Sequence, residues 1–218
     1  MKNHIVLIGM PASGKSTIGV MAAKFLGFDF IDTDILIQKA AGCTLPAIIK
    51  ERGADGFLDF EGEIVRKTCP EAPTVIATGG SVIYRDAAMR HLKSIGTVIY
   101  LKLSCKNLKK RLHALEERGV VIGGDMSFEE LYAERIPLYE RYADVTIEED
   151  GKDTHEILRE LEAAGTVPGF SGDGSGGCEK SPMKKRTSLG ETLEASFFIW
   201  YNYFAMNNTN TYYSPKQG

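Results

Sequence analysis

Residues 9–16 read G-x-x-x-x-G-K-S, the spacing of a phosphate-binding loop that joins a strand to a helix. An apolar run suited to a buried strand, residues 4–8, precedes this loop. A helix-like run, residues 17–26, follows it and stops at Gly27. In such a loop the backbone amides point inward at a helix start, where the helix dipole also favours phosphate oxygens. A glycine-containing turn can match the pattern by accident, but the flanking strand and helix favour a nucleoside triphosphate site.

Each residue type in the loop has an expected part in holding a triphosphate. Lys15 is expected to reach the β and γ phosphates, and the Ser16 hydroxyl is expected to ligate Mg²⁺. Gly9 and Gly14 permit backbone conformations that a side chain would block. We therefore expect the nucleotide to contact these loop residues: Gly9, Pro11, Ala12, Ser13, Gly14, Lys15, Ser16 and Thr17.

Strand-like and helix-like segments alternate over residues 1–164. This alternation predicts an α/β fold with a five-stranded parallel sheet that carries helices on both faces. The strands are expected at residues 4–8, 28–31, 74–77, 97–103 and 143–147. The helices are expected at residues 17–26, 35–40, 45–51, 56–68, 86–92, 106–117 and 153–164, with a further helix capped by Ser127.

Two acidic residues follow the second expected strand, at the edge where sheets of this kind bind ligands. Asp32, directly or through water, is expected to hold Mg²⁺ together with Ser16. Asp34 is expected to face the acceptor and to take a hydrogen bond from the attacking hydroxyl. Helix capping is the alternative for this pair, and the phosphate-binding loop favours the functional interpretation.

Gly79 and Gly80 follow the third expected strand, at the same edge. Their backbone is expected to approach a substrate or phosphate closely, with a plain turn as the alternative. Arg118 precedes a glycine-bearing segment and is expected to close over the transferred phosphate, as a catalytic lid arginine that contacts ATP. Arg118 could instead be an ordinary solvated arginine, and the helix position of Arg135 is equally ambiguous by itself.

The composition argues against several classes of function. The net charge of −3 gives no case for a nucleic-acid partner, and no apolar run approaches the ~18 residues of a membrane span. Because the first expected strand begins almost at the amino terminus, we expect no signal peptide. The cysteines are isolated and read as reduced thiols: Cys43, Cys69, Cys105 and Cys178. We therefore expect a cytoplasmic monomer without a membrane span.

The composition changes after residue 164. Residues 165–177 are rich in Gly and Ser, as in a flexible linker, and residues 196–206 form an aromatic cluster. We therefore divide the chain into a phosphate-loop domain, residues 1–164, and an extension, residues 165–218. A docking tail is one interpretation of this extension, and its lack of periodicity favours the other, a disordered segment.

Taken together, these segments resemble the shikimate kinase family over residues 3–164. The resemblance rests on the phosphate-binding loop with Thr17, on residues 30–34, on Gly79 and Gly80, and on residues 135–144, which carry the most family-specific block. It implies a P-loop fold of the nucleoside-monophosphate-kinase type. It also implies phosphoryl transfer from ATP with Mg²⁺ to the 3-hydroxyl of shikimate, a step of aromatic amino-acid biosynthesis.

The resemblance assigns roles on two sides of the reaction. On the donor and metal side it places Lys15, Ser16, Asp32 and the lid residue Arg118. On the acceptor side it places Asp34, Gly79, Gly80 and Arg135, with Arg135 on the acceptor carboxylate.

Three positions depart from the family pattern. Leu58 stands where the family has an arginine that helps Arg135 bind the carboxylate, Ser81 replaces a third glycine, and Gly119 replaces a proline after Arg118. A lost charge-assisted hydrogen bond of about 1.5–3 kcal/mol would weaken shikimate binding roughly ten- to a hundredfold.

Glu61 matches the carboxylate that steadies the family's arginine, so two interpretations of Leu58 are open. Another cation replaces the arginine, with Lys50, Arg52 and Arg85 as candidates, or the acceptor is a different small hydroxylated metabolite. A non-catalytic nucleotide-binding module is a further alternative. A GTPase is disfavoured because the chain has no Asn-Lys-x-Asp segment for guanine.

Overall fold

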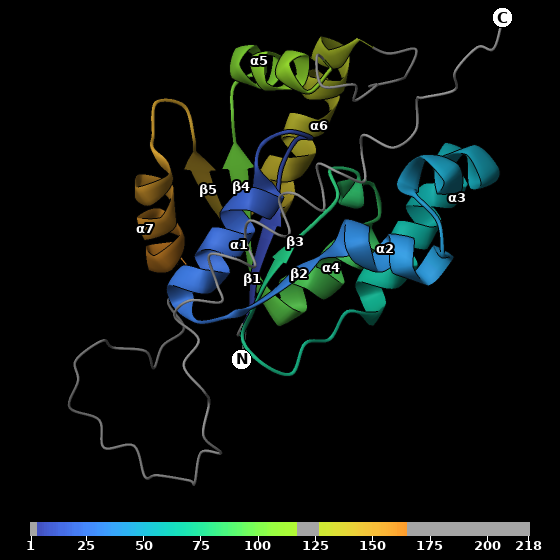
Figure 1. Cartoon of the computed structure of the whole chain (residues 1–218), viewed down its shortest axis with the longest axis horizontal. Coiled ribbons are helices and arrows are strands. Elements are labelled where there is room, and N and C mark those ends of the chain that lie inside the picture. The colour runs from blue at the N-terminus through green and yellow to red at the C-terminus, as the bar shows by residue number, and fades with distance from the viewer. Residues whose placement is uncertain (1–3, 117–126, 165–218) are drawn as a thin grey trace, which may run out of the picture. The chain divides into compact units, whose positions relative to one another are not determined.

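The computed structural model describes residues 4–116 and 127–164 of the chain. Its described strands form one five-stranded sheet in the order β2-β3-β1-β4-β5, and every neighbouring pair is parallel (Figure 1). The strands are β1 (His4–Ile8), β2 (Asp29–Asp32), β3 (Thr74–Ala77), β4 (Gly96–Lys102) and β5 (Val145–Glu148). The predicted α/β fold with a five-stranded parallel sheet is confirmed.

Helices surround this sheet and can be followed by their labels in Figure 1. The helices between β1 and β3 in the sequence are α1 (Lys15–Leu26), α2 (Thr33–Ala41) and α3 (Leu45–Lys67). Those in the remainder of the described chain are η1 (Val82–Tyr84), α4 (Asp86–Ile95), α5 (Cys105–Glu116), α6 (Phe128–Tyr142) and α7 (Thr154–Ala164). The short 3₁₀ turn η1 was not expected from the sequence.

Alternate residues of the central strand enter two separate cores. Val6 and Ile8 of β1 pack with residues of α4 and α6 on one face of the sheet. Ile5 and Leu7 pack with residues of α1 and α7 on the other face. Because both faces are covered, the strand reads as a continuous apolar run and not as an alternating one. Because helices cover both faces of the sheet, its accessible part is the edge at which the strands end.

Local signals decide where two of the helices begin and end. The α1 helix stops at Gly27, which adopts φ +70° and donates its amide to Ala23 O. The α6 helix begins with a full capping box, in which Ser127 and Glu130 each bond the backbone of the other. Both ends lie where the sequence predicted them.

The α3 helix contains the two segments that were expected as separate helices. Residues 45–51 and 56–68 were expected to form two helices, and the run Leu45–Lys67 consists of two helical segments that meet at a non-helical Gly53, as expected. Gly53 adopts φ +72° and ψ 176°, a conformation that glycine adopts at little cost. The chain therefore changes direction at Gly53, and the second half of α3 points its buried face towards η1 and α4.

Three expectations lie outside the described residues: the lid arginine Arg118, its neighbour Gly119 and the extension 165–218. Over the ranges that the structure does describe, none of the helices combines the length and the apolar character needed to cross a membrane.

Candidate active site

The phosphate-binding loop connects β1 to α1 and contains three residues with positive φ. Gly9 adopts φ +153° and Gly14 φ +101°, and Ala12 adopts φ +63°, which is unusual for a residue with a side chain. A side-chain carbon on Gly9 would lie 2.7 Å from the carbonyl oxygen of Leu101 on the neighbouring strand β4. Glycine is therefore needed at position 9 for close approach, as the motif predicts.

The Lys15 side chain folds back over this loop. Its Nζ donates to the carbonyl oxygens of Gly9, at 2.9 Å, and of Met10, at 2.8 Å, and the residue is 7% exposed. Burial lowers the pKa of Lys15 to about 8, opposed by the charges of Asp34 and Asp32. The Lys15 side chain is therefore mostly protonated at neutral pH, and its ammonium group is held by the carbonyl oxygens of the phosphate-binding loop.

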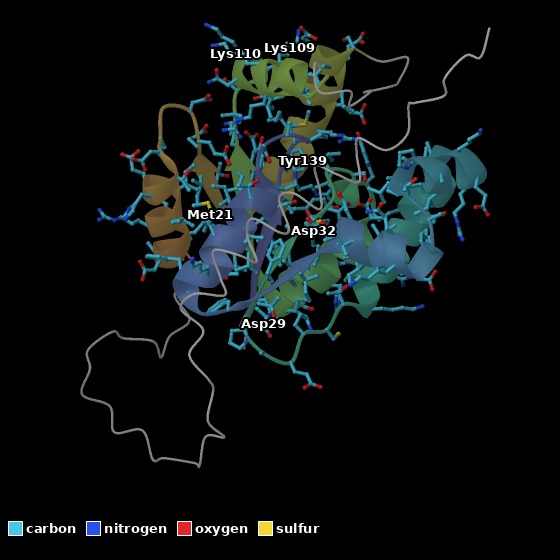
Figure 2. The ribbon with its side chains drawn as sticks, viewed as in Figure 1. Met21, Asp29, Asp32, Lys109, Lys110 and Tyr139 are labelled. Atoms are coloured by element: carbon cyan, nitrogen blue, oxygen red, sulfur yellow. The ribbon has the colours of Figure 1, made fainter. Side chains whose placement is uncertain are left out.

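Ser16 and Asp32 meet between α1 and the end of β2. Ser16 Oγ donates to Asp32 Oδ2 at 2.7 Å, while Asp32 Oδ1 accepts the backbone amide of Asp34 at 2.9 Å. Asp32 therefore caps α2, which was the alternative interpretation, and also faces the phosphate-binding loop, whereas its role as a metal ligand stays a prediction. Figure 2 shows Asp29 and Asp32 at opposite ends of β2, with Asp32 at the end nearer Tyr139. A hydroxyl and a carboxylate side by side are ligands that suit Mg²⁺.

Asp34 lies in the first turn of α2, next to the segment that follows β3. A side-chain carbon on Gly79 would stand 2.9 Å from Asp34 Oδ1. Burial raises the pKa of Asp34 to about 6, and the Asp32 charge adds to this rise while Lys15 opposes it. At neutral pH the carboxylate is mostly ionised and can accept a hydrogen bond from a hydroxyl group.

Gly79 and Gly80 pass between three other parts of the site. The Gly79 amide donates to Thr33 Oγ1 at 3.1 Å, so this amide is already occupied by α2. A side-chain carbon on Gly80 would lie 3.0 Å from Pro11 Cδ and 3.2 Å from Arg135 Nη1. The segment is thus packed closely between the phosphate-binding loop and Arg135, and its approach to a substrate stays a prediction.

Arg135 extends from α6 towards this crossing. Its Nε donates to the Tyr84 hydroxyl at 3.1 Å, and its guanidinium carbon lies 5.2 Å from the Tyr84 ring centroid. The Tyr84 hydroxyl in turn donates to Glu134 at 2.6 Å. Among the residues whose side chains the structure describes, no carboxylate forms an ion pair with Arg135, so its terminal nitrogens can meet an anionic ligand.

Arg111, which no motif singled out, also touches the phosphate-binding loop, and it pairs with the buried Glu149. Arg111 of α5 donates through Nη1 to the carbonyl oxygen of Ser13 at 2.7 Å and to Glu149 Oε2 at 3.3 Å. Burial raises the pKa of Glu149, and the Arg111 charge opposes that rise. The only sequence signal was the basic character of residues 106–117, which does not distinguish one cation from its neighbours.

Tyr139 is a further contact that sequence reasoning did not assign. Its hydroxyl donates to the carbonyl oxygen of Gly80 at 2.6 Å, and its ring stacks on Tyr100 with centroids 5.1 Å apart. Tyr139 is fully buried, and burial raises the pKa of its hydroxyl, which therefore stays protonated as a donor. The α6 helix thus holds the glycine segment through a side chain as well as presenting Arg135.

The shikimate kinase family model matches residues 11–164. The chain belongs to the shikimate kinase family. The "Shikimate kinase" of Thermodesulfovibrio yellowstonii is 38% identical over 163 residues, which cover 74% of this chain and 93% of the relative. The "Shikimate kinase" of Clostridium botulinum is 43% identical over 141 residues, which cover 63% of this chain and 83% of the relative.

Solved structures agree with this family assignment. The shikimate kinase from Acinetobacter baumannii in complex with shikimate superposes with a TM-score of 0.66 at 28% identity, over 74% of this chain and 92% of that chain. The shikimate kinase from Aquifex aeolicus superposes with a TM-score of 0.59 at 28% identity, over 73% of this chain and 94% of that chain. The family expected from the sequence is confirmed.

Leu58, the departure from the family pattern, has a packing role here. It lies half-buried against the small apolar cluster of Ile37, Ile48 and Phe57, which joins α2 to α3. A leucine at this position therefore stabilises the contact between the two helices and offers nothing to a carboxylate.

Of the three cations proposed to replace an arginine at position 58, two contact other residues and the third is exposed. Arg85 pairs with Asp59, at 2.8 Å, and with Asp55 on the exposed side of α3. Arg52 stacks on the ring of Phe60 at 4.4 Å, and Lys50 is exposed to solvent. Among the described residues, then, Arg135 is the cation that the structure brings to Gly80.

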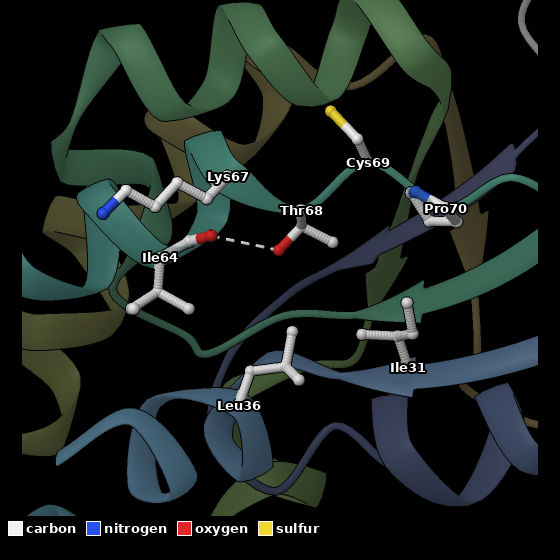
Figure 3. Close-up of a pocket in the computed structure, with 7 residues that line it drawn as sticks. All are labelled: Ile31, Leu36, Ile64, Lys67, Thr68, Cys69 and Pro70. Carbon is white, nitrogen blue, oxygen red and sulfur yellow. Dashed lines mark hydrogen bonds between the residues drawn. The ribbon is translucent and has the colours of Figure 1, made fainter.

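A separate hollow lies between α2, α3 and the end of β2 (Figure 3). Its lining is mostly apolar, and Figure 3 shows the Thr68 hydroxyl turned onto the carbonyl oxygen of Ile64, a bond of 3.0 Å. It contains none of the predicted site residues. Its lining residues are Ile31, Leu36, Ile64, Lys67, Thr68, Cys69 and Pro70.

Proposed function

We propose that this chain catalyses the ATP-dependent transfer of the γ-phosphate to the 3-hydroxyl of shikimate. The observation that carries the proposal is family membership over residues 11–164. It is joined by the position of Gly80, which lies between Pro11 of the phosphate-binding loop and Arg135. The related Acinetobacter baumannii kinase has been solved with shikimate bound. The chain keeps a donor side and an acceptor side at one edge of its sheet.

On the donor side, the loop amides and Lys15 hold the triphosphate. Lys15 Nζ exchanges its two carbonyl partners for phosphate oxygens, which are stronger acceptors because they are charged. Arg111 and Glu149 brace the loop from behind, so its backbone conformation is preformed before the nucleotide binds. Arg118 is proposed to close over the transferred phosphate from the lid.

The donor side also fits Mg²⁺. Ser16 and Asp32 would hold the ion, because their oxygens already lie 2.7 Å apart at the loop and Mg²⁺ is commonly held by one or two protein oxygens plus phosphates. Bound there, Mg²⁺ supplies neutralisation of the charge that develops on the phosphate oxygens.

On the acceptor side, Asp34 and Arg135 orient the substrate. The ionised Asp34 accepts the hydrogen bond of the attacking hydroxyl and takes its proton as the phosphoryl group is transferred. Arg135 pairs with the carboxylate of the acceptor and so fixes which hydroxyl faces the γ-phosphate. Gly80 lets the acceptor side approach Pro11 of the phosphate-binding loop.

A second acceptor class is favoured by one specific observation. Leu58 packs in an apolar cluster, and no cation from the candidates Lys50, Arg52 and Arg85 joins Arg135. A site with one arginine binds a carboxylate less strongly than a site with two. It therefore suits a hydroxylated metabolite whose binding depends less on a carboxylate. Such a kinase would use the same donor side and the same Asp34.

The deciding experiment measures ADP release by the full chain with Mg·ATP, with and without shikimate, for the wild type and Leu58→Arg. Shikimate-dependent turnover by the wild type, with ³¹P NMR placing the phosphate on the 3-hydroxyl, supports the proposal. Turnover that appears only in the variant would assign the wild type to the second acceptor class. ATP binding without shikimate-dependent turnover by either protein would contradict the shikimate proposal and support either the second acceptor class or a nucleotide-binding module.

We also propose that the catalytic domain spans residues 1–164 and acts as a cytoplasmic monomer. The family match ends at residue 164, which supports this boundary. Cys43, Cys69 and Cys105 are free thiols in the structure, in keeping with a reducing compartment. Light scattering of the purified chain tests the oligomeric state, and a dimer mass would contradict it.

A further inference from the structure

Glu61 is a buried carboxyl group that the reaction described above does not use. It lies in the second half of α3 and is 1% exposed. Its Oε2 accepts a hydrogen bond from Ser81 Oγ at 2.7 Å, whereas its Oε1 is buried without a partner. Among the described residues no lysine, arginine or histidine forms an ion pair with it. An ionised carboxylate in such surroundings is costly, because burial penalises the charged form.

The free oxygen of Glu61 lies at the glycine segment of the acceptor side. A side-chain carbon on Gly79 would overlap Glu61 Oε1 and would stand 2.9 Å from Asp34 Oδ1. On the next residue, a side-chain carbon on Gly80 would stand 3.2 Å from Arg135 Nη1. The backbone of two consecutive residues thus separates Glu61 from the guanidinium that meets the acceptor.

We propose that Glu61 is a positioning residue that sets the affinity for the anionic acceptor through its own charge. When Glu61 is neutral, it does not compete with the acceptor carboxylate for the charge of Arg135. In its ionised form it attracts the Arg135 guanidinium and repels that carboxylate, so the acceptor binds more weakly. This inference rests on the proposed function, since it takes the acceptor to be a carboxylate bound by Arg135.

The charges around Glu61 oppose one another, so burial dominates its protonation. Asp34 of α2 disfavours the ionised form, while Arg135 of α6 and Arg85, which precedes α4, favour it. Tyr139 of α6 faces the same region as a neutral hydroxyl. Burial raises the pKa of Glu61 to about 7, opposed first by the Ser81 hydrogen bond. The carboxyl group therefore changes charge within the physiological range of pH.

Ser81 controls the balance because it donates to the carboxyl oxygen. A hydroxyl donor stabilises the ionised form of its partner, so its removal should raise the pKa of Glu61 further. Neither Asp55 nor Asp59 on the same helix competes for this role, since both turn outward to Arg85. Ser81 and Glu61 therefore act as one unit at the acceptor side.

The test measures the KM for shikimate and for ATP from pH 6 to pH 8 in the full chain. For the wild type we expect the KM for shikimate to rise by up to about tenfold over this range, as the neutral form is lost, with little change for ATP. Glu61→Gln should give a low KM for shikimate that no longer varies with pH. Ser81→Ala should move the rise to higher pH. The matched control is Glu63→Gln, which removes an exposed carboxylate from the same helix and should keep the wild-type profile.

A second measurement decides the charge state without relying on turnover. The carboxyl titration of Glu61 is followed by ¹³C NMR in the free protein, with Glu61→Gln to assign the signal. A midpoint near 7 that rises in Ser81→Ala supports the inference. A midpoint in the ordinary range of glutamate overturns it, as does a KM for shikimate that is independent of pH in the wild type. Absence of shikimate turnover at every pH, with Glu61 still titrating near 7, would instead refute the proposed acceptor.

Discussion

Ser16 Oγ donates a 2.7 Å hydrogen bond to Asp32 Oδ2, and this bond ties the first turn of α1 to the end of β2. The other oxygen of Asp32 caps α2, so one carboxylate serves the nucleotide side and the helix that carries Asp34. The metal role and the capping role of Asp32 are separable by mutation, because asparagine caps helices about as well as aspartate.

Asp32→Asn should therefore lower kcat and raise the Mg²⁺ concentration needed for half-maximal activity, with the free energy of unfolding little changed. Asp32→Ala should show the same loss of activity and should also lose about 1 kcal/mol of stability, because the α2 cap is removed. Magnesium titrations of turnover and thermal unfolding measure the two effects. Equal magnesium dependence in the wild type and Asp32→Asn would remove Asp32 from the metal site.

Lys15→Ala should reduce kcat by at least about a hundredfold, because the transferred phosphate loses a positioned cation. Lys15→Met is the matched variant, since it keeps most of the buried side-chain volume without the charge. Circular dichroism should show both variants folded. Wild-type turnover in Lys15→Met would exclude the ammonium group from the mechanism.

Arg135→Ala should raise the KM for shikimate by roughly ten- to a hundredfold, the value of a charge-assisted hydrogen bond to a carboxylate. The KM for ATP should change much less. Arg141→Ala is the control, because Arg141 lies on the same helix, is exposed and stacks on Tyr142 away from Gly80. Equal effects of Arg135→Ala on both substrates would argue against contact with the acceptor carboxylate.

Arg111→Ala should raise the KM for ATP several-fold and lower the Tm by roughly 3 to 10 °C, because Glu149 is left buried without its cation. The double variant Arg111→Ala, Glu149→Gln should recover part of the Tm but not the KM for ATP, since the brace on Ser13 is still missing. Lys110→Ala, at an exposed neighbouring position, should leave both quantities near wild type. A Tm unchanged by Arg111→Ala would show that the pair does not stabilise the loop.

Truncation after Ala164 should leave kcat and both KM values within about twofold of the full chain, if residues 165–218 are an appendage to the domain. Steady-state kinetics and gel filtration of the shortened chain provide the measurement. An aggregated or inactive product would mean that the extension completes the domain.

Local sequence signals accounted for most of the fold. The phosphate-binding loop, the stop at Gly27 and the capping box at Ser127 each depend on residues within a few positions of one another, and each was predicted where it occurs. The break at residue 53 was also predicted from the sequence, because a glycine that adopts positive φ interrupts a helix at little cost.

The long-range contacts that complete the site could not be predicted from local sequence signals. Arg111 meets Ser13 across 98 residues, and Glu61 meets Ser81 across 20. In each case the chain offers several residues of the same chemical type, and only the packing of helices on the sheet selects one. The family resemblance placed the individual residues, but it did not reveal that Ser81 bonds Glu61 one turn away from Leu58.

The hydrogen bond from Tyr139 to the Gly80 carbonyl spans 59 residues, whereas the bond from Ser16 to Asp32 spans 16. During translation, Ser16 and Asp32 are both synthesised long before Tyr139. Both residues therefore precede α6, the helix that completes the acceptor side. A nascent or prematurely terminated chain that lacks α6 would lack both Arg135 and the tyrosine that secures Gly80, and so could not yet select the molecule to be phosphorylated.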